Sequence, residues 1–412
     1  MTPPLPRLHG LPLDAQGRLL LGGQPLSHWA EVLGQTPFYL YDRACIAERV
    51  AALRAALPAG WQLHYAVKAN PMPALVQCLA GLVDGLDVAS AGELRTALDT
   101  GMAPGHVSFA GPGKREAELR QAAAAGIVVN VESERELHAL AAAAQALGRR
   151  PPVALRINPD FEMKGAAARM GGGPRPFGVD AEQAPALLAA MRTLPLEFVG
   201  FHLYFGSQNL QAEGLAQSQR QALALAERLA PHAPGPVRLL NLGGGLGIPY
   251  FPGERPLDLA ALSAAMHALA APLAAAFPQA VPVLELGRYL VGEAGVYVCR
   301  VIDRKVSRGQ VFLVTDGGLH HHLAASGNLG QVLRRNYPVV LAERAAPGPD
   351  EATEVASVVG PLCTGLDLLG DRLRLPPARL GDLVAVLASG AYGASASPNR
   401  FLGHPPPLEA LV

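Results

Sequence analysis

The segment QLHYAVKANPMPALVQCLAGLVDGLDV, residues 62–88, decides the fold because it contains a strand, a helix and a second strand in close succession. Residues 62–67 and 85–88 are short runs of strand-forming character, and residues 73–80 between them have helical character. A strand, a helix and a strand joined by short connections are typical of a parallel βαβ unit. This segment therefore predicts an α/β protein with a parallel sheet.

The same alternation continues through the middle of the chain. Strands are expected at residues 62–67, 85–88, 106–110, 127–131, 153–157, 198–203, 238–242 and 282–286. Helices are expected at residues 73–80, 93–100, 116–125, 134–147, 181–192, 216–229 and 259–276. Eight strands, each followed by a helix except the last, predict a (β/α)8 TIM barrel. A doubly wound sheet is the competing layout, but the GxGxxG expected after its first strand is absent.

The pattern changes beyond residue 290, where strands are expected and long helices are missing. The expected strands are residues 296–306, 310–315, 354–359 and 382–387, and residues 338–350 have the composition of an exposed loop. We therefore expect two domains. Residues 37–289 form the barrel, and residues 1–36 plus 290–412 form a mostly β domain to which the N-terminal residues add strands.

Composition and charge exclude several classes of protein. Lys plus Arg and Asp plus Glu both number 34, so no net charge favours nucleic acid or a membrane surface. The four cysteines are far apart and form no CxxC pair, which argues against a zinc ribbon or a disulfide framework. No signal peptide is evident, and the Ala/Leu-rich stretches carry polar residues at helical spacing. These features predict a cytoplasmic protein with no membrane span.

Residues able to carry chemistry follow the ends of the expected barrel strands, where barrel enzymes place their active sites. They are Lys68, Asp87, Arg156, His202, the run Gly243, Gly244 and Gly245, and Glu285. Each alone has an ordinary structural explanation: a solvated lysine, a core histidine, a tight glycine turn. Together they indicate a site. A desolvated lysine becomes a nucleophile toward carbonyls, and glycine N–H groups can bind a phosphate.

Two other motifs do not support a site of their own. Gly111-Pro112-Gly113-Lys114 is followed by Arg115, where a phosphate-binding Walker loop requires Ser or Thr. His320, His321 and His322 cannot all bind one metal ion from a strand, because adjacent side chains point to opposite faces. We expect no metal site.

These residues resemble the fold-type III, alanine racemase-like family of pyridoxal-phosphate decarboxylases, which includes the diaminopimelate and ornithine enzymes. The resemblance extends from residue 37 to residue 403. The matching motifs, in order, are YAVKAN at 65–70, DVAS at 87–90 with GEL at 92–94, FHLYFGSQ at 201–208, LGGG at 242–245, GR at 287–288, GPLC at 360–363 and SGAYG at 389–393.

The resemblance implies a role for each matching residue. Lys68 matches the lysine that binds the pyridoxal 5'-phosphate aldehyde, and His202 matches the imidazole that stacks on its ring. The phosphate site is matched by Ser207, Gly243, Gly244, Gly245, Gly287, Arg288 and Tyr392. Glu285 matches the carboxylate that faces the pyridine nitrogen, although the usual Glu-Pro-Gly-Arg is Glu285-Leu286-Gly287-Arg288 here. Supporting polar positions are matched by Asp87, Glu93 and Arg156.

The resemblance also implies a homodimer with shared active sites, in which Cys363 comes from the partner subunit. A carboxylate beside the pyridine nitrogen keeps the ring protonated and makes it an electron sink, which suits decarboxylation. Racemases of this fold usually have an arginine there, so Glu285 favours a carboxy-lyase with Cys363 as proton donor. A racemase and a non-catalytic cofactor-binding protein are the alternatives.

The substrate is less defined by the sequence. The acid that follows the cysteine in diaminopimelate and ornithine enzymes is Thr364 here, with Asp367 the nearest acid, and Tyr337 is a further candidate substrate contact. Residues 170–178, 320–322, 335–338 and 397–405 are similar to the butirosin-pathway decarboxylase, which acts on glutamate attached to an acyl carrier protein, and to exosortase A-associated decarboxylases. This similarity favours an amino acid substrate that is carried by an acyl carrier protein, which Arg169 and Arg175 could attract.

Overall fold

The computed structural model describes residues 6–165, 168–348 and 350–412, with the backbone alone at residues 168 and 169. The chain divides into two compact units, each built around its own sheet. The barrel unit comprises Val50–Ile248 and Arg255–Gly287, and the β unit comprises Met1–Arg49, Pro249–Glu254 and Arg288–Val412.

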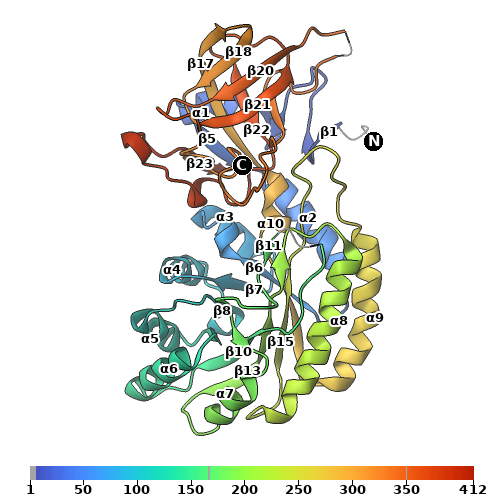
Figure 1. Ribbon diagram of the computed structural model, residues 1–412, viewed down its shortest axis with the longest axis vertical. Helices are drawn as coiled ribbons and strands as arrows, with labels where there is room; N and C mark the ends of the chain where they lie inside the picture. The colour runs from blue at the N-terminus through green and yellow to red at the C-terminus, as the bar shows by residue number, and fades with distance from the viewer. Residues whose placement is uncertain (1–5, 166–167, 349) are drawn as a thin grey trace. The chain divides into compact units, whose positions relative to one another are not determined.

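The barrel unit is a closed, parallel, eight-stranded barrel, as the sequence predicts (Figure 1). Its strands are β6 (Gln62–Ala66), β7 (Gly85–Val88), β8 (Val107–Phe109), β9 (Val128–Val131), β10 (Pro152–Asn158), β13 (Glu197–Leu203), β15 (Leu239–Gly244) and β16 (Val281–Leu286). Pairing of β16 with β6 and of β9 with β10 closes the ring. A further short strand, β12 (Val179–Asp180), pairs in parallel with the last two residues of β10.

Seven helices follow the first seven barrel strands and lie around them (Figure 1). They are α3 (Pro73–Ala80), α4 (Ala91–Asp99), α5 (Glu116–Ala125), α6 (Glu134–Leu147), α7 (Ala184–Met191), α8 (Ala212–Leu229) and α9 (Leu259–Ala276). Local sequence determines their ends: the hydroxyl of Ser133 accepts the N–H of Glu136 at the start of α6, and Gly148 ends that helix in the left-handed conformation. The buried residues of α6 recur every three or four positions, so they form one face of the helix that packs inward.

Helix α9 is the only helix in the described part of the chain that is long and apolar enough to cross a membrane by length and composition. Its most apolar window has a mean hydropathy of 1.6. This is weak evidence for a span, because α9 also packs against α8 as one of the barrel helices.

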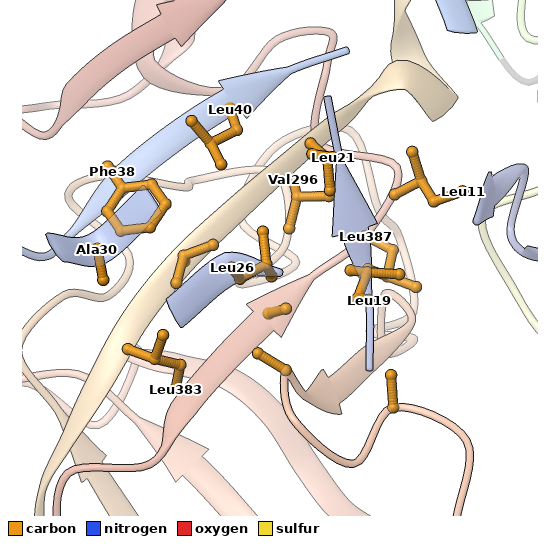
Figure 2. Close-up of a cluster of buried hydrophobic side chains, with 14 of the residues drawn as sticks. Leu11, Leu19, Leu21, Leu26, Ala30, Phe38, Leu40, Val296, Leu383 and Leu387 are labelled. Carbon is orange, nitrogen blue, oxygen red and sulfur yellow. The ribbon is translucent and has the colours of Figure 1, made fainter. Parts of the chain in front are cut away.

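The β unit is built on a sheet with the strand order β19-β22-β17-β18-β20-β21, extended by β5 and β23. Its strands are β5 (Phe38–Tyr41), β17 (Gly295–Ser307), β18 (Gln310–Thr315), β19 (Val339–Leu341), β20 (Glu354–Val359), β21 (Leu368–Leu375), β22 (Leu383–Val386) and β23 (Leu408–Leu411). A buried apolar cluster lies against this sheet and includes Leu19, Leu26, Phe38, Val296 and Leu383 (Figure 2).

Three details of the β unit differ from the expectations. Strand β5, which the expected boundary at residue 37 placed in the barrel, pairs with β17 and β23. Part of the expected loop at residues 338–350 is strand β19, which pairs with β22. The N-terminal strands β1 (Arg7–Leu8) to β4 (Gln24–Pro25) pair only in two short hairpins, and helix α1 (Leu26–Leu33) follows them.

Candidate active site

The polar residues expected at the strand ends lie at one end of the barrel. Strand register places Arg156 beside His202, and Gly244 beside Glu285. Asp87 pairs with Ala66 at the end of β6, where the 3-10 turn Val67–Ala69 begins and presents Lys68. Because the strands are parallel and closed, residues distant in sequence meet at their carboxyl ends.

Lys68, Glu285 and His202 form the centre of this group. The Nζ of Lys68 lies 3.8 Å from Oε1 of Glu285, and Nε2 of His202 lies 3.1 Å from Oε2 of the same carboxylate. Burial by itself would raise the pKa of Glu285, but the contact with His202 and the charge of Lys68 outweigh it, so the pKa lies well below its ordinary value. Glu285 is therefore a buried anion. The Lys68 side chain is 37% exposed, so its amine is only partly desolvated.

Gly287 brings the end of β16 close to the turn that carries Lys68. A Cβ atom at Gly287 would lie 2.8 Å from the Cβ of Ala69 and 3.3 Å from the carbonyl oxygen of Ala66. The glycine therefore permits an approach that a larger residue would prevent. On α4, Glu93 accepts the N–H of Ala89, and burial raises its pKa while the charge of Lys68 lowers it.

Asp87 is buried and belongs to a polar row along neighbouring strands. Its Oδ1 accepts the hydroxyl of Ser108 at 2.5 Å and lies 3.2 Å from Nδ1 of His64. Asn130 donates in turn to Ser108 at 3.1 Å. Burial lowers the pKa of His64, but the charge of Asp87 and their hydrogen bond raise it by more, and the net shift is upward. The row fixes the orientation of Asp87.

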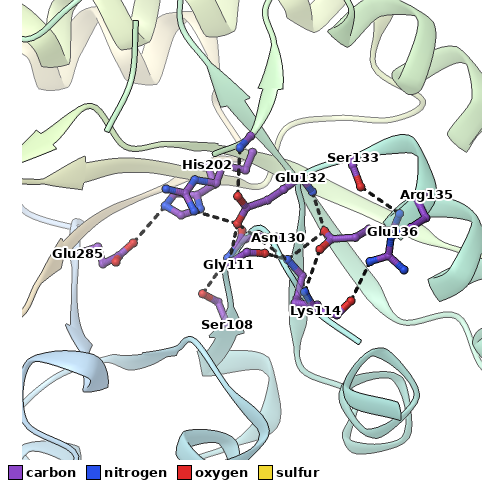
Figure 3. Close-up of polar contacts among 12 residues, drawn as sticks. Ser108, Gly111, Lys114, Asn130, Glu132, Ser133, Arg135, Glu136, His202 and Glu285 are labelled. Carbon is purple, nitrogen blue, oxygen red and sulfur yellow. Dashed lines mark hydrogen bonds and ion pairs between the residues drawn. The ribbon is translucent and has the colours of Figure 1, made fainter. Parts of the chain in front are cut away.

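A second buried network holds Arg156. Its central residue is Glu132, which is not among the residues predicted from the sequence (Figure 3). Glu132 accepts Nη1 of Arg156 at 2.8 Å and the N–H of Gly178 at 3.0 Å. Lys114 pairs with Glu136 at 3.0 Å and lies 3.8 Å from Glu132. The lysine of the Gly-Pro-Gly-Lys motif is thus a buried structural cation. Glu132 directly follows strand β9, so the strand-end rule applied to that strand could have found it.

The glycine run lies against the loop that contains Ser207. Gly243 and Gly245 have φ values of 68° and 83°, and a Cβ at Gly245 would lie 2.5 Å from the carbonyl oxygen of Gly206. The N–H of Asn209 donates to the carbonyl of Gly245 at 2.9 Å. The structure therefore brings Ser207 and the glycine run together, as expected, in a cradle of the kind that binds phosphate.

In the β unit, Arg288 lies among tyrosines. Its guanidinium carbon is 4.9 Å from the centre of the Tyr392 ring and 5.6 Å from that of Tyr250, whose ring is 4.8 Å from that of Tyr337. Burial lowers the pKa of Arg288, but the neighbouring tyrosines raise it by more, so the net shift of the pKa is upward. No carboxylate pairs with this cation among the described residues, which makes it suited to an external anion.

The remaining expected residues of the β unit are Cys363, Thr364 and Asp367, in the loop between β20 and β21. Cys363 is exposed, and Thr364 is partly exposed. Asp367 is 3% exposed, and both of its carboxylate oxygens accept backbone N–H groups. The loop therefore presents the thiol to solvent and keeps the acid inside.

The three histidines lie in and next to a turn, where the rings of His320 and His321 are 3.8 Å apart. His321 contacts Tyr297 and the carbonyl of Pro405, while His322 lies 2.9 Å from the hydroxyl of Ser389. The described residues contain no group of three or more His, Cys, Asp or Glu side chains placed to hold a metal ion.

Of the two arginines expected to attract an acidic carrier, the side chain of Arg169 lies outside the described residues. Arg175 is exposed and donates through Nε to the carbonyl of Gly172. Asn158 anchors this loop, because it accepts the N–H of Gly172 and donates to the carbonyl of Gly173.

The barrel end fits pyridoxal phosphate. Lys68 has an amine that could bind the aldehyde, Glu285 is a buried anion that could face the ring nitrogen, and the glycine run could bind the phosphate. His202 is buried, and the 3.1 Å contact of its Nε2 with Glu285 holds the imidazole ring at this end of the barrel. The fold and these groups define a barrel enzyme of the pyridoxal-phosphate class.

Comparison with known proteins agrees with this class. Residues 43–292 match the family described as pyridoxal-dependent decarboxylase, pyridoxal binding domain. The chain is 39% identical over 380 residues to L-glutamyl-(BtrI acyl-carrier protein) decarboxylase of Niallia circulans, covering 92% of this chain and 89% of that protein. It is 34% identical over 402 residues to diaminopimelate decarboxylase of Aquifex aeolicus, covering 96% and 91%.

A solved structure of a decarboxylase has the same fold as this chain. Diaminopimelate decarboxylase from M. jannaschii, in co-complex with L-lysine, superposes with a TM-score of 0.88 at 26% identity, covering 98% of this chain and 94% of that one. The chain therefore belongs to the pyridoxal-phosphate-dependent decarboxylase family and is a carboxy-lyase.

Proposed function

We propose that this decarboxylase removes the α-carboxyl group of an L-amino acid whose side chain is attached to an acyl carrier protein. The relative from Niallia circulans, 39% identical over 92% of this chain, is named for an acyl-carrier-bound glutamyl substrate. The observation that carries the proposal is the state of Asp367. It is the only acid in residues 360–367, all described, and backbone N–H groups already engage both of its oxygens. The loop thus has no free carboxylate to bind the ammonium group at the far end of a substrate such as diaminopimelate or ornithine.

We assign roles to the barrel residues on the geometry described above. Lys68 holds the cofactor aldehyde, and Glu285 holds a proton on the ring nitrogen. His202 stacks on the ring, while Asp87, Glu93 and Arg156 fix the groups around it. When bound, the cofactor accepts the electrons released as carbon dioxide leaves Cα. The buried anion at position 285 favours this chemistry because an adjacent negative charge stabilises a protonated ring.

We assign the phosphate to two elements that each suit an anion. In the barrel unit these are Ser207 and the glycine run, with Gly287 allowing the close approach to the lysine turn. In the β unit they are Arg288 and Tyr392. Tyr337, packed on Tyr250, remains a proposed substrate contact, as does Thr364.

We propose a homodimer in which Cys363 of one subunit serves the barrel site of the other. Its exposure is consistent with use by a second chain, because a thiol that faces solvent in one chain is available to a partner. Cys363 would deliver the proton that replaces the carboxyl group at Cα. None of the four cysteines is in a disulfide bond, which suits the cytoplasmic location expected from the sequence.

The test is carbon dioxide release from the twenty free amino acids, free diaminopimelate and ornithine, and glutamyl attached to a phosphopantetheinylated carrier protein. We expect kcat/KM to be highest with the carrier-bound substrate. Glutamyl-pantetheine without the carrier separates recognition of the arm from recognition of the protein, and the Lys68→Ala enzyme gives the blank. Faster turnover of free diaminopimelate than of carrier-bound glutamyl would disprove the proposed substrate and leave the decarboxylase class intact.

A further inference from the structure

The loop that carries Cys363 is tied to a neighbouring turn of the β unit by one buried carboxylate. Asp367 accepts the N–H of Leu319 through Oδ1 at 2.6 Å and the N–H of Leu362 through Oδ2 at 2.8 Å. Leu319 follows strand β18, and Leu362 is the residue before Cys363. A single side chain therefore joins the turn after β18 to the residue adjacent to the thiol.

Two glycines make room for this carboxylate. A Cβ atom at Gly318 would lie 2.1 Å from Oδ1 of Asp367, and one at Gly360 would lie 2.3 Å from Oδ2. Contacts this short do not occur for real Cβ atoms, so both positions have to be glycine while Asp367 is in place. Sequence on both sides of the carboxylate is thus adapted to it.

A second tie runs beside the first. The buried hydroxyl of Thr315 lies 2.7 Å from the carbonyl of Gly317 and 3.1 Å from the carbonyl of Val359, at the ends of the same two segments. Within the loop, the N–H of Gly360 donates to the Asp367 carbonyl at 3.1 Å. Burial raises the pKa of Asp367, and the two backbone N–H groups offset only part of that shift. Its hydrogen-bonding capacity is directed inward, toward the protein.

We propose that Asp367 is a positioning residue that holds Cys363 where it can protonate the product, in place of the substrate contact expected from the sequence. This inference rests on the proposed role of Cys363 as proton donor. If Asp367 acts through the loop, its replacement should lower the turnover rate equally for every substrate, because it displaces the thiol. It does not affect the contact with the distal group of the substrate. A residue that bound the distal group would discriminate between substrates.

The test combines Asp367→Asn with Cys363→Ala in the intact holoenzyme. Asn keeps the size but points an N–H₂ group at a backbone N–H, which breaks one of the two ties. We expect kcat to fall about 10- to 100-fold with each active substrate while KM stays nearly constant. In the Cys363→Ala background the same change should lower kcat less than about twofold, because residues that act as a unit are not additive. Equal effects in both backgrounds would overturn the proposal.

A second readout does not depend on catalysis. The rate at which iodoacetamide alkylates Cys363, followed by peptide mass spectrometry, should rise in Asp367→Asn, because an untied loop samples more open positions. Thr315→Val removes the second tie at nearly constant volume and should also raise the alkylation rate of Cys363. It replaces Asp367→Asn if that variant does not fold. Asp371→Asn is the matched control, since that acid accepts the hydroxyl of Ser357 on the same sheet and should change neither readout.

The outcomes separate the two proposals. An unchanged alkylation rate in both tie variants would overturn the positioning role, whatever the enzyme's substrate. A KM that rises only for substrates with a distal ammonium, at constant kcat, would restore Asp367 as a substrate contact. Absence of carbon dioxide release by the wild-type enzyme would disprove the proposed function, and the alkylation rate would still decide whether Asp367 holds the loop.

Discussion

The Nζ of Lys68 lies 3.8 Å from Oε1 of Glu285, which joins the first and the last strands of the barrel at their carboxyl ends. The pair is adjacent because the barrel closes: Glu285 is beside His64 in the strand register, four residues before the lysine. Closure of the sheet thus brings together an amine and a carboxylate that are more than 200 residues apart. The two roles that we propose, binding an aldehyde at Lys68 and stabilising a protonated ring at Glu285, require an amine and a carboxylate at the same end of the barrel.

Replacement of Lys68 should abolish turnover. Lys68→Ala removes the amine that forms the bond to the aldehyde, so we expect no carbon dioxide release, no absorbance at about 400 nm and no adduct after borohydride treatment. Lys68→Arg is the matched variant, because it keeps a positive charge near Glu285 but cannot form the same bond. Full activity in either variant would show that another amine holds the cofactor.

Replacement of Glu285 by Gln should lower kcat about 100-fold with little change in overall fold, because it removes the charge that stabilises a protonated ring. Glu285→Asp keeps the charge and should recover part of the rate. The measurement is single-turnover carbon dioxide release, together with loss of optical activity in the substrate. A rate of Glu285→Gln equal to that of the wild type would remove the electrostatic argument for decarboxylation.

The repeating part of the fold could be predicted from sequence because its signal is local. The eight barrel strands differ from their expected bounds by at most two residues, since each is a short apolar run between helices with their own end signals. Strand β5 could not be assigned in this way. The residues Phe38–Tyr41 have strand character in either unit, and only their distant partners in β17 and β23 decide where they pair.

The candidate site also contains residues that local sequence predicts and residues whose state depends on distant contacts. Lys68 and Glu285 follow strands and carry charge, so a rule about strand ends finds them. The state of Asp367 depends on the N–H of Leu319, almost fifty residues away, and no local pattern encodes that contact. Lys114 was placed in a motif that fails as a phosphate loop, but its pairing with Glu136 requires the packing of two neighbouring barrel segments.

The buried Glu132 should make stability depend on pH. Burial raises its pKa, but the charges of Arg156 and Lys114 lower it by more, so the folded value lies below the ordinary 4.5. A depressed pKa contributes stability above the unfolded value, and this contribution is lost as the pH falls through the folded value. The free energy of unfolding should therefore decrease below pH 4.5, because the unfolded chain binds the proton more readily.

Glu132→Gln tests this dependence. It should lower the free energy of unfolding by about 3 kcal/mol at neutral pH, since it leaves two buried cations with one fewer partner. It should also flatten the decrease between neutral and acid pH. Urea unfolding of the apoenzyme over that range measures both quantities, and Glu134→Gln, at an exposed acid on the adjacent helix, is the control. Parallel pH profiles for Glu132→Gln and the wild type would contradict the assignment.

The glycine cradle can be tested with two glycines that share a backbone conformation and differ in their surroundings. Gly245 has a φ of 83°, and an added Cβ would lie 2.5 Å from the carbonyl oxygen of Gly206. Gly253 has a φ of 87°, and nothing lies within 4 Å of an added Cβ. Alanine at either position adds backbone strain of about 1–2 kcal/mol, but only at Gly245 does it also push the Ser207 loop away. We expect Gly245→Ala to raise the Kd for pyridoxal phosphate about tenfold or more, and Gly253→Ala to leave it nearly unchanged, in titrations of the apoenzyme followed by absorbance.

Equal Kd values in the two variants would mean that the glycine run does not hold the phosphate.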